Sequence, residues 1–100
     1  MTEFTEQVLD IIKSIPYGHV MTYGQIAAIA GNPRGARQVS RILHSMSGAH
    51  QLPWHRVINS QGGISLTGEG GFVQTQLLLS EGIEVRHKRV DLKRYRYDFN

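Results

Sequence analysis

The sequence feature that most limits the fold of this chain is a pair of helix signals separated by a tight turn. Thr22 and Gln25 have the spacing of a capping box, which predicts a short helix over residues 23–30. Residues 31–33, Gly-Asn-Pro, supply a left-handed terminator and a turn, and apolar residues at helical spacing predict a second helix over about residues 35–46. Two short helices joined by such a turn predict a helix-turn-helix.

The elements around this pair are expected to complete one mainly α-helical domain. An amphipathic helix is predicted over residues 4–15, because apolar side chains recur there at helical spacing after Thr2, whose hydroxyl can cap the helix. Val57 and Ile58 predict a short strand that pairs back with Ile64 as a two-stranded wing. The fold class is therefore expected to be a winged helix-turn-helix with a short extended segment at the carboxyl end.

The last third of the chain carries weaker signals. A polar, glycine-rich loop is expected over residues 65–71, followed by a helix over residues 72–80 whose evenly spread apolar residues should be largely buried. From residue 83 onward, alternation of aromatic and charged residues fits a strand or hairpin, and Asp91 could equally cap a helical turn. The aromatic residues of that alternation are Tyr95, Tyr97 and Phe99. Residues 86–96 hold six of the eleven Lys and Arg residues, a density usually explained by solvation of a surface strand.

The exposed face of the helix over residues 35–46 favours contact with nucleic acid. Arg37, Gln38 and Arg41 alternate there with small residues such as Ser40, and small side chains allow a helix to lie close to another surface. No acidic residue occurs between residues 31 and 69, so this part of the chain repels no phosphate. The net charge of +3 points weakly in the same direction, and the alternative interpretation is an ordinary solvated helix face.

Missing residue types and patterns narrow the possible functions. The chain has no cysteine, which excludes disulfides, thiolate catalysis and zinc–thiolate sites. Its histidines lack the spacing of metal ligands, so we expect no metal and no other cofactor. No apolar run approaches the ~20 residues of a membrane span, and no signal peptide is recognisable. We therefore expect a cytoplasmic protein without a membrane partner, associated with the nucleoid when bound to DNA.

Residues 52–59, Leu-Pro-Trp-His-Arg-Val-Ile-Asn, form the candidate functional stretch. Its tryptophan, Trp54, is the only one in the chain, and such polar neighbours are unusual for a tryptophan that merely fills a core. Pro53 restricts the backbone, so the segment should be a rigid loop rather than the interior of a helix. A bulky aromatic side chain on a stiff loop indicates the wall of a pocket.

Four motifs of the chain together resemble the DNA-binding domain of the O6-alkylguanine-DNA alkyltransferases. They are Thr-Tyr-Gly-Gln-Ile-Ala around Tyr23, Ala-Arg-Gln-Val around Arg37, Pro-Trp-His-Arg-Val from Pro53, and Leu-Leu-Ser-Glu-Gly around Glu81. In that family the third motif is Pro-Cys-His-Arg, and its cysteine accepts the alkyl group. Here Trp54 stands in place of the cysteine, as in the alkyltransferase-like proteins. The resemblance spans nearly the whole chain and implies a single alkyltransferase-like DNA-binding domain over residues 1–100.

The resemblance implies that the protein recognises O6-alkylguanine in double-stranded DNA without repairing it. Dealkylation needs a thiolate nucleophile and an indole has no such atom, so no residue is expected to be catalytic. The implied DNA-binding residues are Tyr23, Arg37, Gln38, Ser40 and Arg41. The implied lesion pocket is lined by Tyr23, Trp54, Arg56, Val57, Thr67 and Gly68.

Individual roles also follow from the resemblance. Arg37 would enter the duplex and fill the space of the flipped base, while Tyr23 would crowd the neighbouring phosphate and rotate the nucleotide outward. The recognition helix would lie in the minor groove. His55 and Glu81, the activating pair of the family, are expected to persist as a hydrogen-bonded pair with a structural role.

A bound but unrepaired lesion is useful only as a flag, and in the family that flag is read by nucleotide-excision repair proteins. The chain itself is expected to be a monomer. Two positions depart from the alkyltransferase pattern: Met46 replaces a usual asparagine, and residues 65–68 lack the basic residue that some relatives place near the alkyl group. Three alternatives stay open, namely a winged helix-turn-helix regulator that reads the major groove, an enzyme using His55 and Glu81 on another substrate, and a domain that binds DNA through charge alone.

Overall fold

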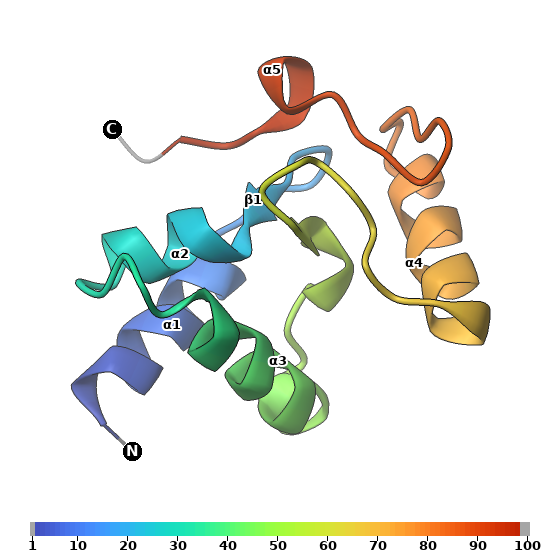
Figure 1. The fold of residues 1–100 in the computed structure, drawn as a ribbon. Helices are drawn as coiled ribbons and strands as arrows, with labels where there is room; N and C mark the ends of the chain where they lie inside the picture. Colours follow the sequence, from blue (N-terminus) through green and yellow to red (C-terminus); the bar gives the residue numbers. More distant parts are fainter. Residues whose placement is uncertain (1, 99–100) are drawn as a thin grey trace.

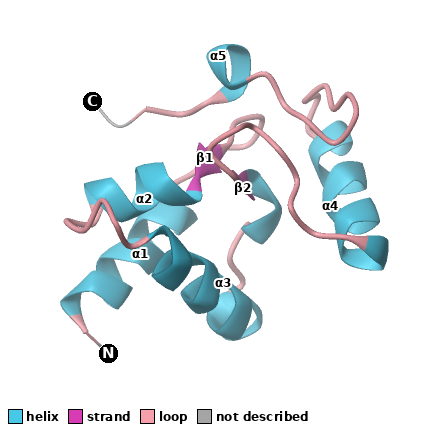
Figure 2. Ribbon diagram, in the orientation of Figure 1, coloured by secondary structure: helices cyan, strands magenta, loops and turns pink. Residues whose placement is uncertain are grey.

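The computed structural model describes residues 2–98 and shows helices arranged around a two-stranded sheet (Figures 1 and 2). In chain order the elements are α1 (Glu3–Lys13), β1 (Met21–Thr22), α2 (Tyr23–Ile29), α3 (Ala36–His50), the 3-10 turn η1 (Trp54–Arg56), β2 (Val57–Ile58), α4 (Gly68–Ser80) and α5 (Leu92–Tyr95). Helices α1–α3 pack together, while α4 stands apart from them and contacts η1 (Figure 1). The chain is mainly α-helical with a small sheet, as predicted.

The predicted helix-turn-helix is formed by α2 and α3. The hydroxyl of Thr22 accepts a hydrogen bond from the Gln25 N–H at 3.0 Å, and the Gln25 side chain accepts one in return from the Thr22 N–H, which completes the capping box. After α2, Gly31 has a φ of +100°, a conformation that residues with a side chain rarely adopt. Ile26 of α2 and Val39 of α3 are both fully buried in one core cluster with α1, which fixes the two helices relative to each other.

The ends of the first and third helices differ from the predicted ones. α1 begins after Thr2, whose hydroxyl accepts a hydrogen bond from the Thr5 N–H at 3.1 Å, so the predicted cap is confirmed, although the helix ends at residue 13 rather than 15. α3 continues to residue 50 instead of ending at 46. Gly48 does not stop it, because glycine in a helix costs only about 1 kcal/mol relative to alanine. The helix ends at Gln51, which has a left-handed φ of 50°.

The two-stranded sheet has a different partner from the predicted one. β1 and β2 pair in parallel, with Met21 opposite Val57 and Thr22 opposite Ile58. The predicted pairing of β2 with Ile64 is therefore wrong. The turn after β2 is closed by the Asn59 side chain, which accepts hydrogen bonds from the backbone N–H groups of residues 61 and 63. The Asn59 N–H also donates to the Gly63 carbonyl at 3.0 Å, so the turn is closed at residues 59–63 and no ladder continues from β2 to Ile64.

Residues 62–64 pair instead with the carboxyl-terminal segment. The Ile64 N–H donates to the Lys88 carbonyl at 2.9 Å, and the Val90 N–H donates to the Gly62 carbonyl at 2.8 Å. Local sequence patterns do not identify a pairing between segments more than twenty residues apart. Ile64 and Val90 are both buried in a second core cluster, which also holds Val20 and Leu78.

Helix α4 starts earlier and is more exposed than predicted. It begins at Gly68, inside the stretch expected to be a loop, and only Gly71, Gln74 and Leu78 of its residues are buried. Phe72 is 65% exposed, so the prediction of a largely buried helix is wrong. A Cβ on Gly71 would lie 2.5 Å from the Leu66 carbonyl oxygen. Glycine at this position therefore allows α4 to pack closely against the loop before it.

The carboxyl-terminal segment contains both a hairpin and a helical turn, the two alternatives predicted for it. Residues 86–89 form a tight hairpin, and Asp91 caps the single helical turn of α5 through a hydrogen bond from the Lys93 N–H at 3.0 Å. Tyr95 lies in α5, so the strand predicted there is wrong, and its side chain is buried in the second core cluster. The prediction for Phe99 lies outside the described residues.

Candidate nucleic-acid interface

The exposed face of α3 carries the side chains that the sequence assigned to DNA contact. Val39 and Leu43 are buried beneath it, while Arg37, Gln38, Ser40 and Arg41 are exposed. Arg37 and Arg41 have no acidic partner among the described residues. This face therefore presents two unpaired positive charges at the second helix of a helix-turn-helix.

A cavity of about 180 Å³ opens beside this face. It is lined by Tyr23, Ser40, Leu43, His44, Ser47, Trp54, Leu66 and Gln74. The structure thus brings Tyr23 and Trp54 together at one cavity, as the sequence predicted. Arg56, Val57, Thr67 and Gly68 do not line it: Arg56 points to Glu81, Val57 is buried in β2, and residues 67–68 start α4.

Several lining residues were missed by the sequence reasoning. His44 and Ser47 lie on the same face of α3 as Ser40, at helical spacing from it. Because Ser40 had been assigned to DNA contact, this spacing could have identified the other two. Leu66 had no signal, because its place depends on the pairing of the carboxyl-terminal segment. Gln74 had no distinguishing signal either, because α4 carries two glutamines and only the structure shows that Gln74 is the buried one.

A larger hollow of about 820 Å³ lies between the start of α1 and α3. Gln38 and Arg41 contribute to its wall, but no residue of the Trp54 stretch does. The larger hollow is therefore separate from the cavity at Trp54, and the predicted site residues divide between the two.

The Trp54 side chain is held in place by the turn that carries it. η1 starts after Pro53, and the indole packs partly against the first core cluster and edge-on to the His55 ring, with ring centroids 6.2 Å apart. The buried amide of Gln74 donates hydrogen bonds to the carbonyls of His55 and Val57, each at 3.1 Å. Helix α4 thereby fixes the backbone that immediately follows Trp54.

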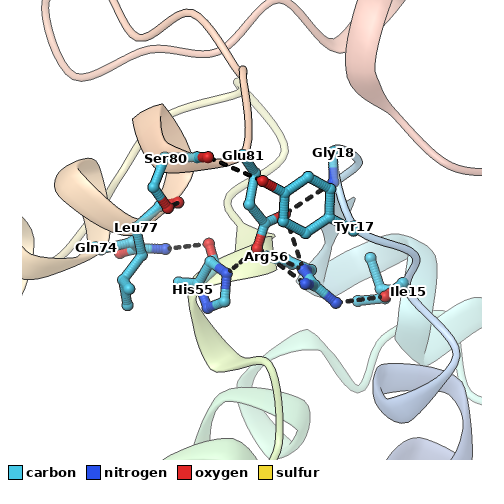
Figure 3. A network of polar contacts seen from close by, with 9 residues as sticks. All are labelled: Ile15, Tyr17, Gly18, His55, Arg56, Gln74, Leu77, Ser80 and Glu81. Atoms are coloured by element: carbon cyan, nitrogen blue, oxygen red, sulfur yellow. Dashed lines mark hydrogen bonds and ion pairs between the residues drawn. The ribbon is translucent and has the colours of Figure 1, made fainter.

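His55 and Arg56, the two residues after Trp54, converge on the carboxylate of Glu81 (Figure 3). The His55 Nε2 lies 2.6 Å from Glu81 Oε2, and the Arg56 guanidinium donates to both carboxylate oxygens at 2.9–3.0 Å. The hydrogen bond expected between His55 and Glu81 is therefore present. The Gly18 N–H also donates to this carboxylate at 2.8 Å, which ties the loop after α1 to the end of α4.

These contacts determine the charge state of Glu81. Burial alone would raise the pKa of its carboxyl group, but the hydrogen bonds from Arg56, Gly18 and His55, together with the positive charge of Arg56, outweigh burial and lower the pKa below its usual value. Glu81 is thus ionised at neutral pH, and the His55 Nε2 must be the donor in their hydrogen bond. Both carboxylate oxygens of Glu81 accept hydrogen bonds, so the group connects the end of α4 with η1 and with the loop after α1.

Tyr17 extends the same network to the surface. Its hydroxyl donates to the Ser80 carbonyl at 2.9 Å, and the Arg56 guanidinium lies 5.8 Å from its ring centroid (Figure 3). Arg56 also donates to the Ile15 carbonyl at 2.9 Å. The network therefore joins the segment after α1, the turn η1 and the end of α4.

Tyr23 occupies the rim between the helix-turn-helix and the cavity. Burial raises the pKa of its phenol, and a hydrogen bond with the Ser65 side chain offsets part of that effect. The hydroxyl is consequently protonated at neutral pH and available as a hydrogen-bond donor. Tyr23 is the first residue of α2, so its backbone position is fixed by the Thr22 cap.

The described residues offer neither a metal site nor a membrane-spanning helix. Among residues 2–98 no group of three or more His, Asp or Glu side chains is placed to hold a metal ion. No helix within the same range has the length and apolar character needed to cross a membrane.

Comparison with known proteins gives concordant matches. The model of the family described as 6-O-methylguanine DNA methyltransferase, DNA binding domain, matches residues 3–83. The DNA base-flipping protein of Escherichia coli (strain K12) is 46% identical over 97 residues, which cover 96% of this chain and 75% of that protein. Alkyltransferase-like protein 1 of Schizosaccharomyces pombe is 44% identical over 87 residues, which cover 85% of this chain and 81% of that protein.

A solved structure shares the fold over almost its full length. The crystal structure of S. pombe Atl1 in complex with damaged DNA containing O6-carboxymethylguanine superposes with a TM-score of 0.87 at 38% sequence identity, and the match covers 98% of this chain and 97% of that one. The four sequence motifs and the cavity at Trp54 agree with these matches. The chain therefore belongs to the 6-O-methylguanine DNA methyltransferase family, in its alkyltransferase-like branch.

Proposed function

We propose that this protein binds O6-alkylguanine in double-stranded DNA by flipping the damaged nucleotide into the cavity at Trp54, and that it leaves the alkyl group in place. One observation carries the proposal: Trp54, in the position of the family's acceptor cysteine, lines a cavity that opens beside the cationic face of α3. The S. pombe relative solved with damaged DNA supports it.

The positions of two side chains support the flipping step. A base must leave the stack before a cavity can hold it, which costs a few kcal/mol and less where pairing is already weak. Arg37, exposed and unpaired at the second position of α3, is placed to enter the duplex and fill the vacated space. Tyr23, at the cavity rim, is placed to press on the adjacent phosphate. The small residues of α3 suit a shallow approach to the minor groove.

Once flipped, the modified base would meet an aromatic wall. Stacking of a base on an aromatic side chain contributes roughly 1–3 kcal/mol, and an O-alkyl group adds apolar surface to that contact. No side chain at the cavity wall is a thiol, and the imidazole of His55 is committed to Glu81. The proposal is thus recognition without enzymatic repair.

The remaining parts of the proposal concern partners. A lesion that is bound but not repaired must be passed on, and we infer that nucleotide-excision repair proteins receive it from a monomeric complex on DNA in the cytoplasm. This step rests on the resemblance to alkyltransferase-like proteins.

Titration of the protein with a short duplex containing one O6-methylguanine, alongside the unmodified duplex at the same salt concentration, tests the proposal. Because Trp54 is the only tryptophan, its fluorescence reports from the cavity. We expect tighter binding and a fluorescence change with the lesion, at one protein per duplex, and affinity for both duplexes should fall as salt rises. Equal binding to both duplexes with unchanged fluorescence would support a general winged helix-turn-helix protein instead.

The variant Trp54→Cys is expected to bind the lesion without acquiring rapid methyl transfer. Replacing an indole by a thiol enlarges the cavity, so the sulfur and the alkyl carbon would not be held at reacting distance. Mass spectrometry of the protein after incubation with the lesion duplex measures the transfer. A gain of one methyl group within minutes would show that the cavity already has the geometry of an active site.

A further inference from the structure

Gln74 is the only polar residue of α4 whose side chain is buried, with 3% of the residue exposed. It belongs to none of the four motifs that carry the family resemblance, yet it lines the cavity at Trp54. Its amide nitrogen holds the backbone after Trp54, whereas its amide oxygen takes no part in that contact. The oxygen is therefore not needed to keep this backbone in place.

The partners of the amide nitrogen determine the direction of the side chain. Nε2 of Gln74 donates to the carbonyls of His55 and Val57, each at 3.1 Å, and Figure 3 shows the first of these bonds. An amide nitrogen carries two hydrogens, and these two bonds use both of them. With the amide turned over, its oxygen would face two carbonyl oxygens, which accept hydrogen bonds but cannot donate them. The amide oxygen, Oε1, is therefore directed away from the two carbonyls.

The Oε1 atom is accessible from the cavity. Among the described residues it receives no hydrogen bond. Within the same part of the chain, the only side-chain nitrogen or oxygen atom that is fully enclosed and unpaired is Nδ1 of His19. Oε1 is therefore not fully enclosed, although Gln74 as a whole is buried. Since Gln74 lines the cavity at Trp54, the cavity is the open space that its oxygen reaches.

Oε1 is the one side-chain acceptor of the cavity that cannot change its role. The other polar side chains that line the cavity come from α3 and from the start of α2, namely Ser40, His44, Ser47 and Tyr23. A hydroxyl group can rotate to donate or to accept, and an imidazole does either according to its tautomer. The oxygen of Gln74 can only accept. The cavity therefore has one position that requires a hydrogen-bond donor on its ligand.

An O6-alkylated guanine carries one donor group on its pairing edge. Alkylation of O6 removes the hydrogen from N1, so both O6 and N1 can only accept hydrogen bonds. The exocyclic 2-amino group keeps its two hydrogens and remains a donor. Proteins that flip a base read its pairing edge through hydrogen bonds of this kind. The 2-amino group is therefore the part of the lesion that matches Oε1.

We propose that Oε1 of Gln74 accepts a hydrogen bond from the 2-amino group of the flipped O6-alkylguanine, and that Gln74 thereby favours lesions of guanine over other alkylated bases. This inference deepens the proposed function and rests on it, because it needs a nucleotide in the cavity at Trp54. A flipped base without the amine leaves the buried oxygen unpaired, which weakens binding. Trp54 then contributes affinity through its ring, whereas Gln74 selects the base.

Duplexes with and without the amine test the proposal. One contains O6-methylguanine and the other contains O6-methylhypoxanthine, which lacks only the 2-amino group, at the same position opposite cytosine and at the same salt concentration. The measured quantity is the ratio of the two dissociation constants, obtained from Trp54 fluorescence. In Gln74→Met the ratio should shift by about three- to tenfold against O6-methylguanine, the effect of one hydrogen bond. The two duplexes differ in pairing strength, but that difference is the same for every variant and cancels in the comparison.

Two further variants separate recognition of the base from support of the backbone. Gln74→Lys keeps hydrogen-bond donors for the carbonyls of His55 and Val57 but has no acceptor, so it should shift the ratio as Gln74→Met does. Its added charge acts on both duplexes alike. The matched control is Gln76→Met, the same substitution at the exposed glutamine of α4, which should leave the ratio unchanged.

A purely structural role of Gln74 predicts a different result. Both duplexes would then lose affinity alike, and an unchanged ratio in Gln74→Met and Gln74→Lys would overturn the proposal. An equal shift in Gln76→Met would overturn it as well. Thermal unfolding of each variant measures its stability, and if Gln74→Met does not fold, Gln74→Lys decides the question. The proposed function is judged separately, by the preference of the unaltered protein for the O6-methylguanine duplex over the unmodified one.

Discussion

Replacement of Arg37 by alanine is expected to weaken binding to the O6-methylguanine duplex roughly 30- to 100-fold. This corresponds to about 2–3 kcal/mol, the scale of the unstacking cost that a side chain inserted in the duplex would offset. Arg37 is exposed and contacts no acidic residue among those described, so the fold should lose nothing. Fluorescence titration of Trp54 gives the affinity, and thermal unfolding gives the stability.

The matched control for that experiment is Arg34→Ala. Arg34 lies three residues earlier, in the turn before α3, and is also exposed. Removing it takes away the same charge, so the affinity for both duplexes should change alike. If Arg37→Ala bound the lesion duplex as tightly as the unaltered protein, Arg37 would not be the inserted side chain.

Glu81→Ala is expected to lower the free energy of unfolding by about 3 kcal/mol, with a fall in Tm of about 12 °C or more. Its side chain is only 5% exposed and accepts hydrogen bonds from His55, Arg56 and Gly18. Without it, the Arg56 guanidinium, 18% exposed, would be left largely buried and unpaired. Denaturant unfolding followed by circular dichroism measures the effect.

Glu81 should also give the protein a characteristic dependence on pH. Its pKa is lowered in the folded state, so its contribution to stability is complete above the usual pKa of 4.5 and is lost as pH falls through the lower folded value. Glu81→Gln should remove this loss. The control Glu84→Gln, at an exposed ion pair, should retain it. A variant at Glu81 with the original acid sensitivity would show that another carboxyl group is responsible.

The sequence predicted the elements whose signals are local. The Thr22–Gln25 capping box and Gly31 fixed the start of α2 and the turn after it, and both are found as expected. The Pro-Trp-His-Arg motif pointed to a cavity at Trp54, which the structure contains. In each case the determining contacts join residues close in the sequence or lie within one rare motif.

Features that depend on distant pairing were not predictable in this way. Ile64 hydrogen-bonds to residue 88 rather than to β2, and that choice depends on how the carboxyl-terminal segment packs. The place of Leu66 at the cavity follows from the same pairing. The sequence of α4 shows no clear helical periodicity, because its apolar residues are spread around the whole helix. Its position depends instead on the close approach of Gly71 to the Leu66 carbonyl, which the sequence does not reveal.

The indole at the cavity wall determines how many lesions one protein molecule can bind in the proposed pathway. A protein that takes an alkyl group onto its own side chain is consumed by the event, whereas Trp54 has no atom that accepts one and the molecule leaves each encounter unchanged. Under the proposed function, one copy would therefore mark many lesions in succession. The duration of the signal is then set by the dissociation rate constant, so variants that lengthen or shorten residence on the lesion should alter repair without altering any chemical step.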